Sequence, residues 1–207
     1  MMRLDQIFLK NGCDKYAHHY YKEYAKEFEP IREEEINILE IGIWKGTSHQ
    51  SWVDYFPNAN IYGIDIFSRV EPKDVSILQH DRVHWVKGDS TSKDIVTKVK
   101  EEFGDIKFDY IIDDGLHTPK ANMDTVNNLW NFLIEGGVFY VEDVWPIGKM
   151  TESEMRHPWI QKHPDRYNIE DWDKFESAIK DLNVSSVMEI DFRNVSTPDS
   201  VIIKLVK

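Results

Sequence analysis

Short apolar runs separated by amphipathic segments follow one another along the chain. The runs cover residues 37–41, 61–66, 83–87, 108–112, 138–141, 187–192 and 201–206. Runs of this length, bounded by polar or glycine-containing turns, predict strands. Helical spacing of the apolar residues between the earlier runs predicts the strand–helix alternation that is typical of a parallel sheet.

The segments between the runs predict helices. Apolar residues at three- and four-residue steps favour helices at 14–28, 93–103, 119–134 and 171–182. We expect Thr47 or Ser48 to cap a further helix, and Gly136 with Gly137 to stop the one before them. The short polar connection between the last two runs predicts an antiparallel hairpin. The pattern as a whole predicts a Rossmann-like α/β fold, with a seven-stranded, mostly parallel sheet and helices on both faces.

One domain accounts for the whole chain. No repeat, low-complexity stretch or flexible linker divides the 207 residues, a length that suits one α/β domain. We expect a single domain over 1–207 that begins with a helical segment at 1–35. Residues 145–168 lack periodicity and contain three prolines and two histidines. Because long loops in compact domains usually serve a function, we expect this one beside the active site.

Charge and cysteine content exclude several classes of function. The chain has 25 basic and 37 acidic side chains, a formal net charge of -12, which disfavours nucleic acid as a partner. Its single cysteine, Cys13, excludes an internal disulfide and a cysteine-based zinc site. No apolar run approaches the roughly 20 residues that cross a bilayer, and the N-terminus lacks the apolar core of a signal peptide. We therefore expect a cytoplasmic protein without a membrane partner, whose state as a monomer or homo-oligomer is open.

Four features lie at the carboxyl ends of successive predicted strands, where open α/β sheets bind ligands. They are the Gly42 to Gly46 turn, Asp65, Asp89 after Gly88, and Asp113. Each has an ordinary structural explanation on its own, such as a turn or a helix cap. Their ordered recurrence favours a cofactor site. The glycine spacing is not G-x-G-x-x-G, so the dinucleotide fingerprint is absent.

A second group of polar residues favours acid–base or metal chemistry. Asp114 and His117 follow the fourth predicted strand, and Glu142 and Asp143 follow the fifth. Three carboxylates brought to one edge would repel one another unless a cation or a proton intervened. Oxygen ligands suit magnesium, and an imidazole is a workable general base. We therefore expect a metal at Asp114, Glu142 and Asp143, with His117 as the base.

The ordered set ILEIGIWKGTS, YGIDI, VKGDS and YIIDDG resembles the class I S-adenosylmethionine-dependent methyltransferases. The resemblance covers most of the chain and includes the terminal hairpin. It implies S-adenosylmethionine as the cofactor, with Gly42, Gly46 and Ser48 near its methionine and ribose parts. It also implies Asp65 at the ribose and Asp89 at the adenine.

The pairing of IIDDGLH with GGVFYVEDV resembles a narrower group, the metal-dependent sugar O-methyltransferases of macrolide and tetracenomycin-type biosynthesis. It implies Mg²⁺ or another divalent cation on Asp114, Glu142 and Asp143, His117 as the base, and a small-molecule acceptor such as a sugar or glycoside. The early segment CDKYAHHYY resembles an N-terminal D-K-x-x-x-H-x-Y element of that group. Leu116 departs from the usual small residue, which leaves the acceptor open.

Other interpretations are compatible with the residues. The enzyme could dispense with metal and methylate an amine, the fold could be retained as a non-catalytic cofactor-binding module, or a nicotinamide could replace the expected cofactor. The basic side chains in 145–168 could contact an anionic substrate, although a solvated loop is the simpler interpretation. His18 and His19 could edge the mouth of the active site, although a position at the surface or at an interface is the simpler interpretation.

Overall fold

The computed structural model describes all 207 residues and contains a seven-stranded sheet in the order β3-β2-β1-β4-β5-β7-β6. The strands are β1 (Asn37–Ile41), β2 (Asn60–Asp65), β3 (Val83–Lys87), β4 (Phe108–Asp113), β5 (Leu133–Val141), β6 (Ser186–Asp191) and β7 (Val201–Val206). Strands β1 to β5 run parallel, whereas β7 is antiparallel to both β5 and β6. The predicted Rossmann-like sheet with its terminal hairpin is confirmed.

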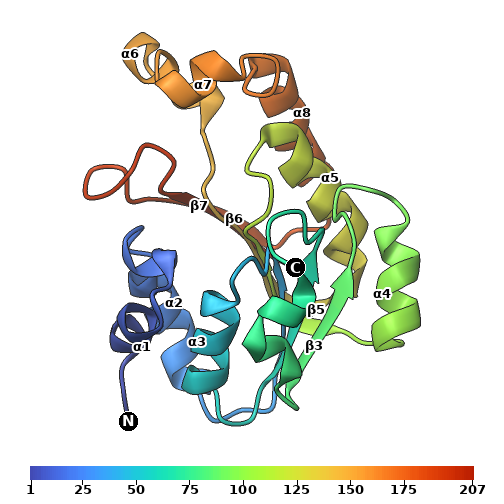
Figure 1. Cartoon of the computed structure of the whole chain (residues 1–207). Helices are drawn as coiled ribbons and strands as arrows, with labels where there is room; N and C mark the ends of the chain where they lie inside the picture. The colour runs from blue at the N-terminus through green and yellow to red at the C-terminus, as the bar shows by residue number, and fades with distance from the viewer.

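Helices cover both faces of the sheet (Figure 1). On one side are α1 (Leu4–Asn11), α2 (Tyr21–Phe28) and α3 (Thr47–Tyr55), and on the other are α4 (Ile95–Phe103), α5 (Pro119–Leu129) and α8 (Ile169–Asp181). Two short helices, α6 (Glu152–Met155) and α7 (Pro158–Lys162), stand apart at the top of the view. None of the helices combines the length and the apolar character that a membrane crossing requires.

The central strands are buried on both faces, which explains why they appear in the sequence as continuous apolar runs. In β5, Phe139 and Val141 pack with the α4, α5 and α8 side, while Val138 and Tyr140 pack with the α1 to α3 side. Side chains of a strand point alternately to opposite faces, so one run serves two hydrophobic cores.

The N-terminal segment differs from the single helix predicted over 14–28. The first half of that predicted helix is wrong. A 3₁₀ turn at Asp14–Tyr16 is followed by a bend at His19, whose φ is 62°, and α2 begins only at Tyr21. The bend turns Lys15 and Tyr20 toward the sheet, where both are buried. A continuous helix would have carried one of them to solvent. Helix α1 lies within the helical segment expected over 1–35 and buries Leu4, Ile7 and Phe8.

The helix predicted over 119–134 is too long. Helix α5 ends at Leu129, a 3₁₀ turn covers Trp130–Phe132, and β5 already begins at Leu133. Gly136 and Gly137 therefore lie within the strand and do not stop the helix. They accompany a shift in the β4–β5 register, an irregularity for which glycine is well suited. Residues 145–168, expected as a loop, include α6 and α7.

Gly42 ends β1 in a conformation that other residues adopt only at a cost. Its φ is 93°, and an added Cβ would lie 2.1 Å from the backbone oxygen of Asp114. Gly136 also has a positive φ, 78°, but a Cβ there would meet nothing within 4 Å. A substitution at Gly136 therefore carries only the conformational cost of the positive φ, whereas a substitution at Gly42 carries that cost and a steric clash as well.

We predict that Gly42→Ala lowers the free energy of unfolding by at least about 3 kcal/mol, because left-handed strain and a backbone clash add together. Gly136→Ala, the matched control, should lose only about 1 kcal/mol, which is the conformational part alone. Urea unfolding of both variants measures the difference. Equal losses of stability in the two variants would contradict the close approach of Gly42 to the backbone of Asp114.

Candidate active site

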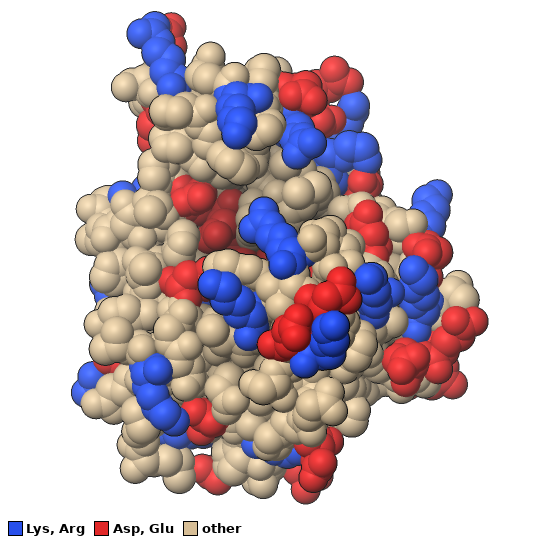
Figure 2. Space-filling model, viewed as in Figure 1, with Lys and Arg blue, Asp and Glu red and all other residues tan.

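Neighbouring strands bring the predicted functional residues to one edge of the sheet. Strands β2, β1, β4 and β5 adjoin in that order, and Asp113 of β4 pairs with Val141 of β5. The residues that follow, Asp114 and Glu142, therefore leave the sheet side by side. Figure 2 shows acidic side chains recessed in a hollow on this side of the molecule, below the part that carries α6 and α7.

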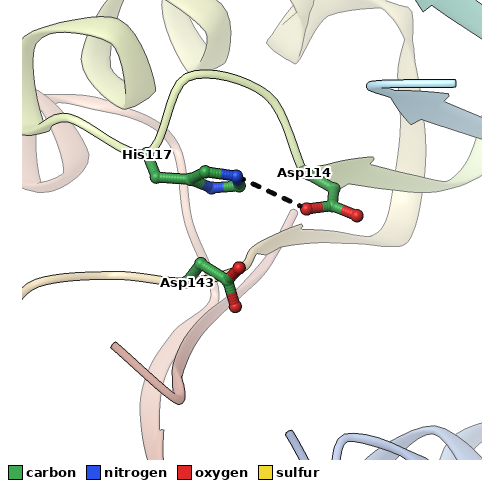
Figure 3. A group of neighbouring side chains, drawn as sticks. All are labelled: Asp114, His117 and Asp143. Carbon is green, nitrogen blue, oxygen red and sulfur yellow. Dashed lines mark ion pairs between the residues drawn. The ribbon is translucent and has the colours of Figure 1, made fainter. Parts of the chain in front are cut away.

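Three of the predicted residues face one another. One ligand atom each from Asp114, His117 and Asp143 lies within 4.8 Å of the others, and Figure 3 shows the three side chains converging. Their side chains are 20%, 27% and 18% exposed, so the group is reached from solvent. His117 and Asp143 have φ values of 57° and 51°, and such strain in non-glycine residues is typical of functional sites.

Glu142, expected as a third metal ligand, does not join this group. Its side chain is 1% exposed and faces inward. One carboxylate oxygen contacts the Lys15 ammonium, and the other accepts a hydrogen bond from the Tyr24 hydroxyl. Both oxygens are thus engaged within the protein.

Lys15, which sequence reasoning did not select, lies at the centre of the carboxylates. Its Nζ is 2.7 Å from Asp114 Oδ2 and 3.1 Å from Glu40 Oε1, in addition to its contact with Glu142. The side chain is 1% exposed. The D-K pair of the N-terminal element contains this lysine, so that resemblance was the one signal that could have identified it.

The same N-terminal segment holds Asp143. The Tyr20 hydroxyl donates to Asp143 Oδ1 at 2.6 Å, and His18 Nδ1 lies 3.3 Å from the same oxygen. His18 also contacts Ser200 Oγ, at 2.9 Å, in the β6–β7 connection. The sequence left open a surface position for His18 or one at the active-site mouth, and the structure places it against the acidic group.

The acidic group contains more negative than positive charge, and the pKa values reflect this. Burial raises the pKa of Asp114 to about 6 against the opposing charges of Lys15 and His117, and it raises the pKa of Glu142 well above its usual range. Burial alone would also raise the pKa of Glu40, but Lys15 and hydrogen bonds outweigh it and lower that pKa to about 2. Burial lowers the pKa of His117, but nearby carboxylates outweigh it and raise the pKa above 6.5. An additional cation would relieve the excess charge.

At the predicted cofactor site, Asp65 closes the glycine-containing turn. Its Oδ2 accepts hydrogen bonds from the backbone N–H groups of Ile43 and Trp44 at 2.8 and 2.9 Å, and its Oδ1 accepts from Phe67 at 2.5 Å. The carboxylate therefore organises the turn after β1. Asp89 is exposed at the end of β3 and accepts from the backbone and hydroxyl of Thr91.

Ser48 and Gly46 have structural roles in the turn. Ser48 is buried and donates its hydroxyl hydrogen to Glu40. Gly46, with a φ of 75°, is the residue before α3, and no side chain caps this helix. The expected cap by Thr47 or Ser48 is wrong. Gly46 occupies the N-cap position, and the Ser48 hydroxyl donates to Glu40 instead.

Asp113 lies beneath the edge. It is 1% exposed, and its Oδ2 accepts a hydrogen bond from Asn122 Nδ2 at 3.1 Å. It links the end of β4 to α5 and so orients the intervening loop that carries Asp114 and His117. This position makes Asp113 a support of the site, one layer below its surface.

The chain is similar to known methyltransferases in sequence. A family described as "Methyltransferase domain" matches residues 39–144, about half of the chain. The 8-demethyl-8-(2-methoxy-alpha-L-rhamnosyl)-tetracenomycin-C 3'-O-methyltransferase of Streptomyces olivaceus is 30% identical over 151 residues, 69% of this chain and 37% of the relative. The mycinamicin VI 2''-O-methyltransferase of Micromonospora griseorubida is 28% identical over 137 residues, 63% of this chain and 32% of the relative. The chain thus spans about a third of these curated relatives.

The fold is similar to a solved structure of the same kind. The MycE methyltransferase of the mycinamycin biosynthetic pathway, crystallised in complex with Mg and SAH, matches with a TM-score of 0.70. The identity is 20%, and the match covers 99% of this chain and 54% of that one. At this identity the similarity establishes the fold.

The buried Asp113 should give the protein a measurable pH dependence. Burial raises its pKa from 3.8 to about 6, so the folded protein favours the protonated carboxyl. Its contribution to stability is complete below about pH 4 and is lost as the pH rises to about 6. We predict that Asp113→Asn removes this loss and gains stability relative to wild type over that window, by on the order of 3 kcal/mol at pH 7. Urea unfolding at several pH values tests this, and parallel profiles for the two proteins would contradict it.

Proposed function

The chain belongs to the family of methyltransferase domains that matches its residues 39–144, and we propose that it methylates a hydroxyl group of a small molecule, preferably a sugar, using S-adenosylmethionine. The observation that carries this proposal is the convergence of Asp114, His117 and Asp143 beside the glycine-containing turn. The rhamnosyl group in the name of one relative supports the acceptor class.

The residues beside the turn fit the cofactor. Asp65 and Asp89 follow adjacent strands at the edge where α/β sheets bind nucleotides. A carboxylate offers about four acceptor positions. The backbone donors of Ile43, Trp44 and Phe67 use two on Oδ2 and one on Oδ1. Asp65 therefore keeps an acceptor position on Oδ1 for a ribose hydroxyl without opening the turn.

The donor set at the edge also fits a divalent cation. Mg²⁺ is commonly bound through one or two carboxylates and retains several waters. Asp114 and Asp143 provide two carboxylates that face the same partly exposed space. These two carboxylates would be sufficient to hold the cation without Glu142.

His117 is positioned to accept a proton. Its Nε2 lies 3.6 Å from Asp114 Oδ1, so the protonated ring would be stabilised by that carboxylate. When bound, the cation would supply the positive charge that lowers the pKa of the acceptor hydroxyl. The acceptor oxygen would bond to the methyl carbon as the sulfur–methyl bond of S-adenosylmethionine breaks. S-adenosylhomocysteine would leave with that electron pair, and His117 would take the hydroxyl proton.

Binding of S-adenosylhomocysteine and of Mn²⁺ tests the two halves of the site separately. We predict by isothermal titration that wild type binds both, whereas Asp114→Asn binds S-adenosylhomocysteine with unchanged affinity but loses Mn²⁺ binding. Asp124→Asn is the matched control, because that carboxylate pairs with Lys120 on α5 away from the site. Failure of wild type to bind S-adenosylhomocysteine would overturn the proposal. Binding of the cofactor without metal would leave a metal-independent transferase.

The role of His117 predicts a loss of turnover without a loss of binding. His117→Ala should lower kcat by about 10²–10⁴-fold, the usual contribution of a general base, with little change in S-adenosylhomocysteine affinity. His80→Ala, an exposed histidine before β3, is the control. The readout is S-adenosylhomocysteine formation with a panel of simple rhamnosides and related glycosides. An unchanged kcat would show that His117 is not the base.

A further inference from the structure

The Lys15 ammonium is buried among three carboxylates, of which the proposed chemistry uses only Asp114. Burying a lysine is strongly unfavourable unless its charge is paired and its hydrogens are donated. Its Nζ contacts Glu40, Asp114 and Glu142. The ammonium donates hydrogen bonds to Asp114 and Glu142 and forms an ion pair with Glu40, so one side chain offsets the charge of three carboxylates.

Lys15 divides the acidic group into an inner and an outer part. Asp114 belongs to both, because its Oδ2 contacts Lys15 at 2.7 Å while its Oδ1 faces His117 at 3.6 Å. Glu142 belongs to the inner part alone, with Lys15 on one oxygen and Tyr24 on the other. Asp143 belongs to the outer part and is held there by Tyr20.

We propose that Lys15 is a positioning residue: a resident cation that retains Glu142 and one oxygen of Asp114 in the interior, and so limits the divalent cation to the outer oxygens of Asp114 and Asp143. The inference rests on the proposed function for the divalent cation. The pairing of Lys15 with Glu142 is independent of it. Glu142 then has a different role from the one that its place in the E-D pair implies.

The geometry favours this division over a site shared by the metal and all three carboxylates. A divalent cation between Asp114 and Glu142 would occupy the position of Lys15 Nζ, and two positive charges cannot share it. Displacing Lys15 would also leave Glu40 without its ammonium, deep beneath the turn at 0% exposure. A cation bound to the outer oxygens of Asp114 and Asp143 would neither displace Lys15 nor leave Glu40 unpaired.

Mn²⁺ affinity, followed by electron paramagnetic resonance, tests the proposal in a double-mutant cycle. With Lys15 present, Glu142→Gln should change the affinity by less than about threefold, because Glu142 is not a ligand. Lys15→Met should tighten binding at least about tenfold, because a nearby positive charge is removed. In the Lys15→Met background, Glu142→Gln should weaken binding by about tenfold or more, because Glu142 has become a ligand.

Thermal unfolding in chelator tests the pairing without any metal. Lys15→Met should lower Tm by roughly 10 °C because it leaves buried carboxylates unpaired. Adding Glu142→Gln should restore part of this loss. The control is Lys10→Met, which removes an exposed lysine paired with Asp54 at 3.0 Å and should change Tm little.

The outcomes separate the two proposals. If wild type binds no Mn²⁺, the cation part of the proposed function fails, and the melting temperatures still decide the role of Lys15. A tenfold or greater loss of Mn²⁺ affinity in Glu142→Gln with Lys15 present would overturn the resident-cation role. So would a Lys15→Met protein as stable as wild type. If Lys15→Met does not fold, Glu142→Gln alone decides, since its affinity is measured with Lys15 in place.

Discussion

One buried ion-pair cluster, with Lys15 at its centre, connects the parts of the molecule on which the site depends. The lysine comes from the turn between α1 and α2, whereas Glu40 lies within β1, and Asp114 and Glu142 directly follow the adjacent strands β4 and β5. Removing one charge of such a cluster leaves others unpaired at low dielectric, which is more costly than any exposed ion pair. The N-terminal segment is therefore a component of the site. Without it, the edge of the sheet would carry repelling carboxylates.

Around that cluster, the site is assembled by sheet register and by strained loop residues. Pairing of Asp113 with Val141 fixes where the two loops begin, and the positive φ values of His117 and Asp143 turn their side chains to the same space. Gly42 permits the β1 turn to touch the backbone of Asp114. These local constraints account for a group of three side chains that is open to solvent yet held by buried partners.

The sequence predicts most of the fold, because doubly buried strands must be continuous apolar runs and parallel strands must deliver their ends to one edge. It predicts less of the site. A lysine is expected at the surface when only its residue type is considered. That three carboxylates from distant parts of the chain surround Lys15 is apparent only in the tertiary structure. The inward orientation of Glu142 likewise depends on Lys15 and Tyr24, which lie more than a hundred residues away in the chain. The break at His19 was not predicted because Ala17, Tyr20 and Tyr24 keep helical spacing across it.

In the proposed site, a divalent cation and the Lys15 ammonium occupy separate halves of one acidic group. A crystal structure of the chain with S-adenosylhomocysteine and Mn²⁺, with the metal located by its anomalous scattering, measures this most directly. We predict one peak within bonding distance of oxygens of Asp114 and Asp143, with Lys15 Nζ still between Asp114 and Glu142. A peak bonded to Glu142 at the present position of Lys15 Nζ would contradict it.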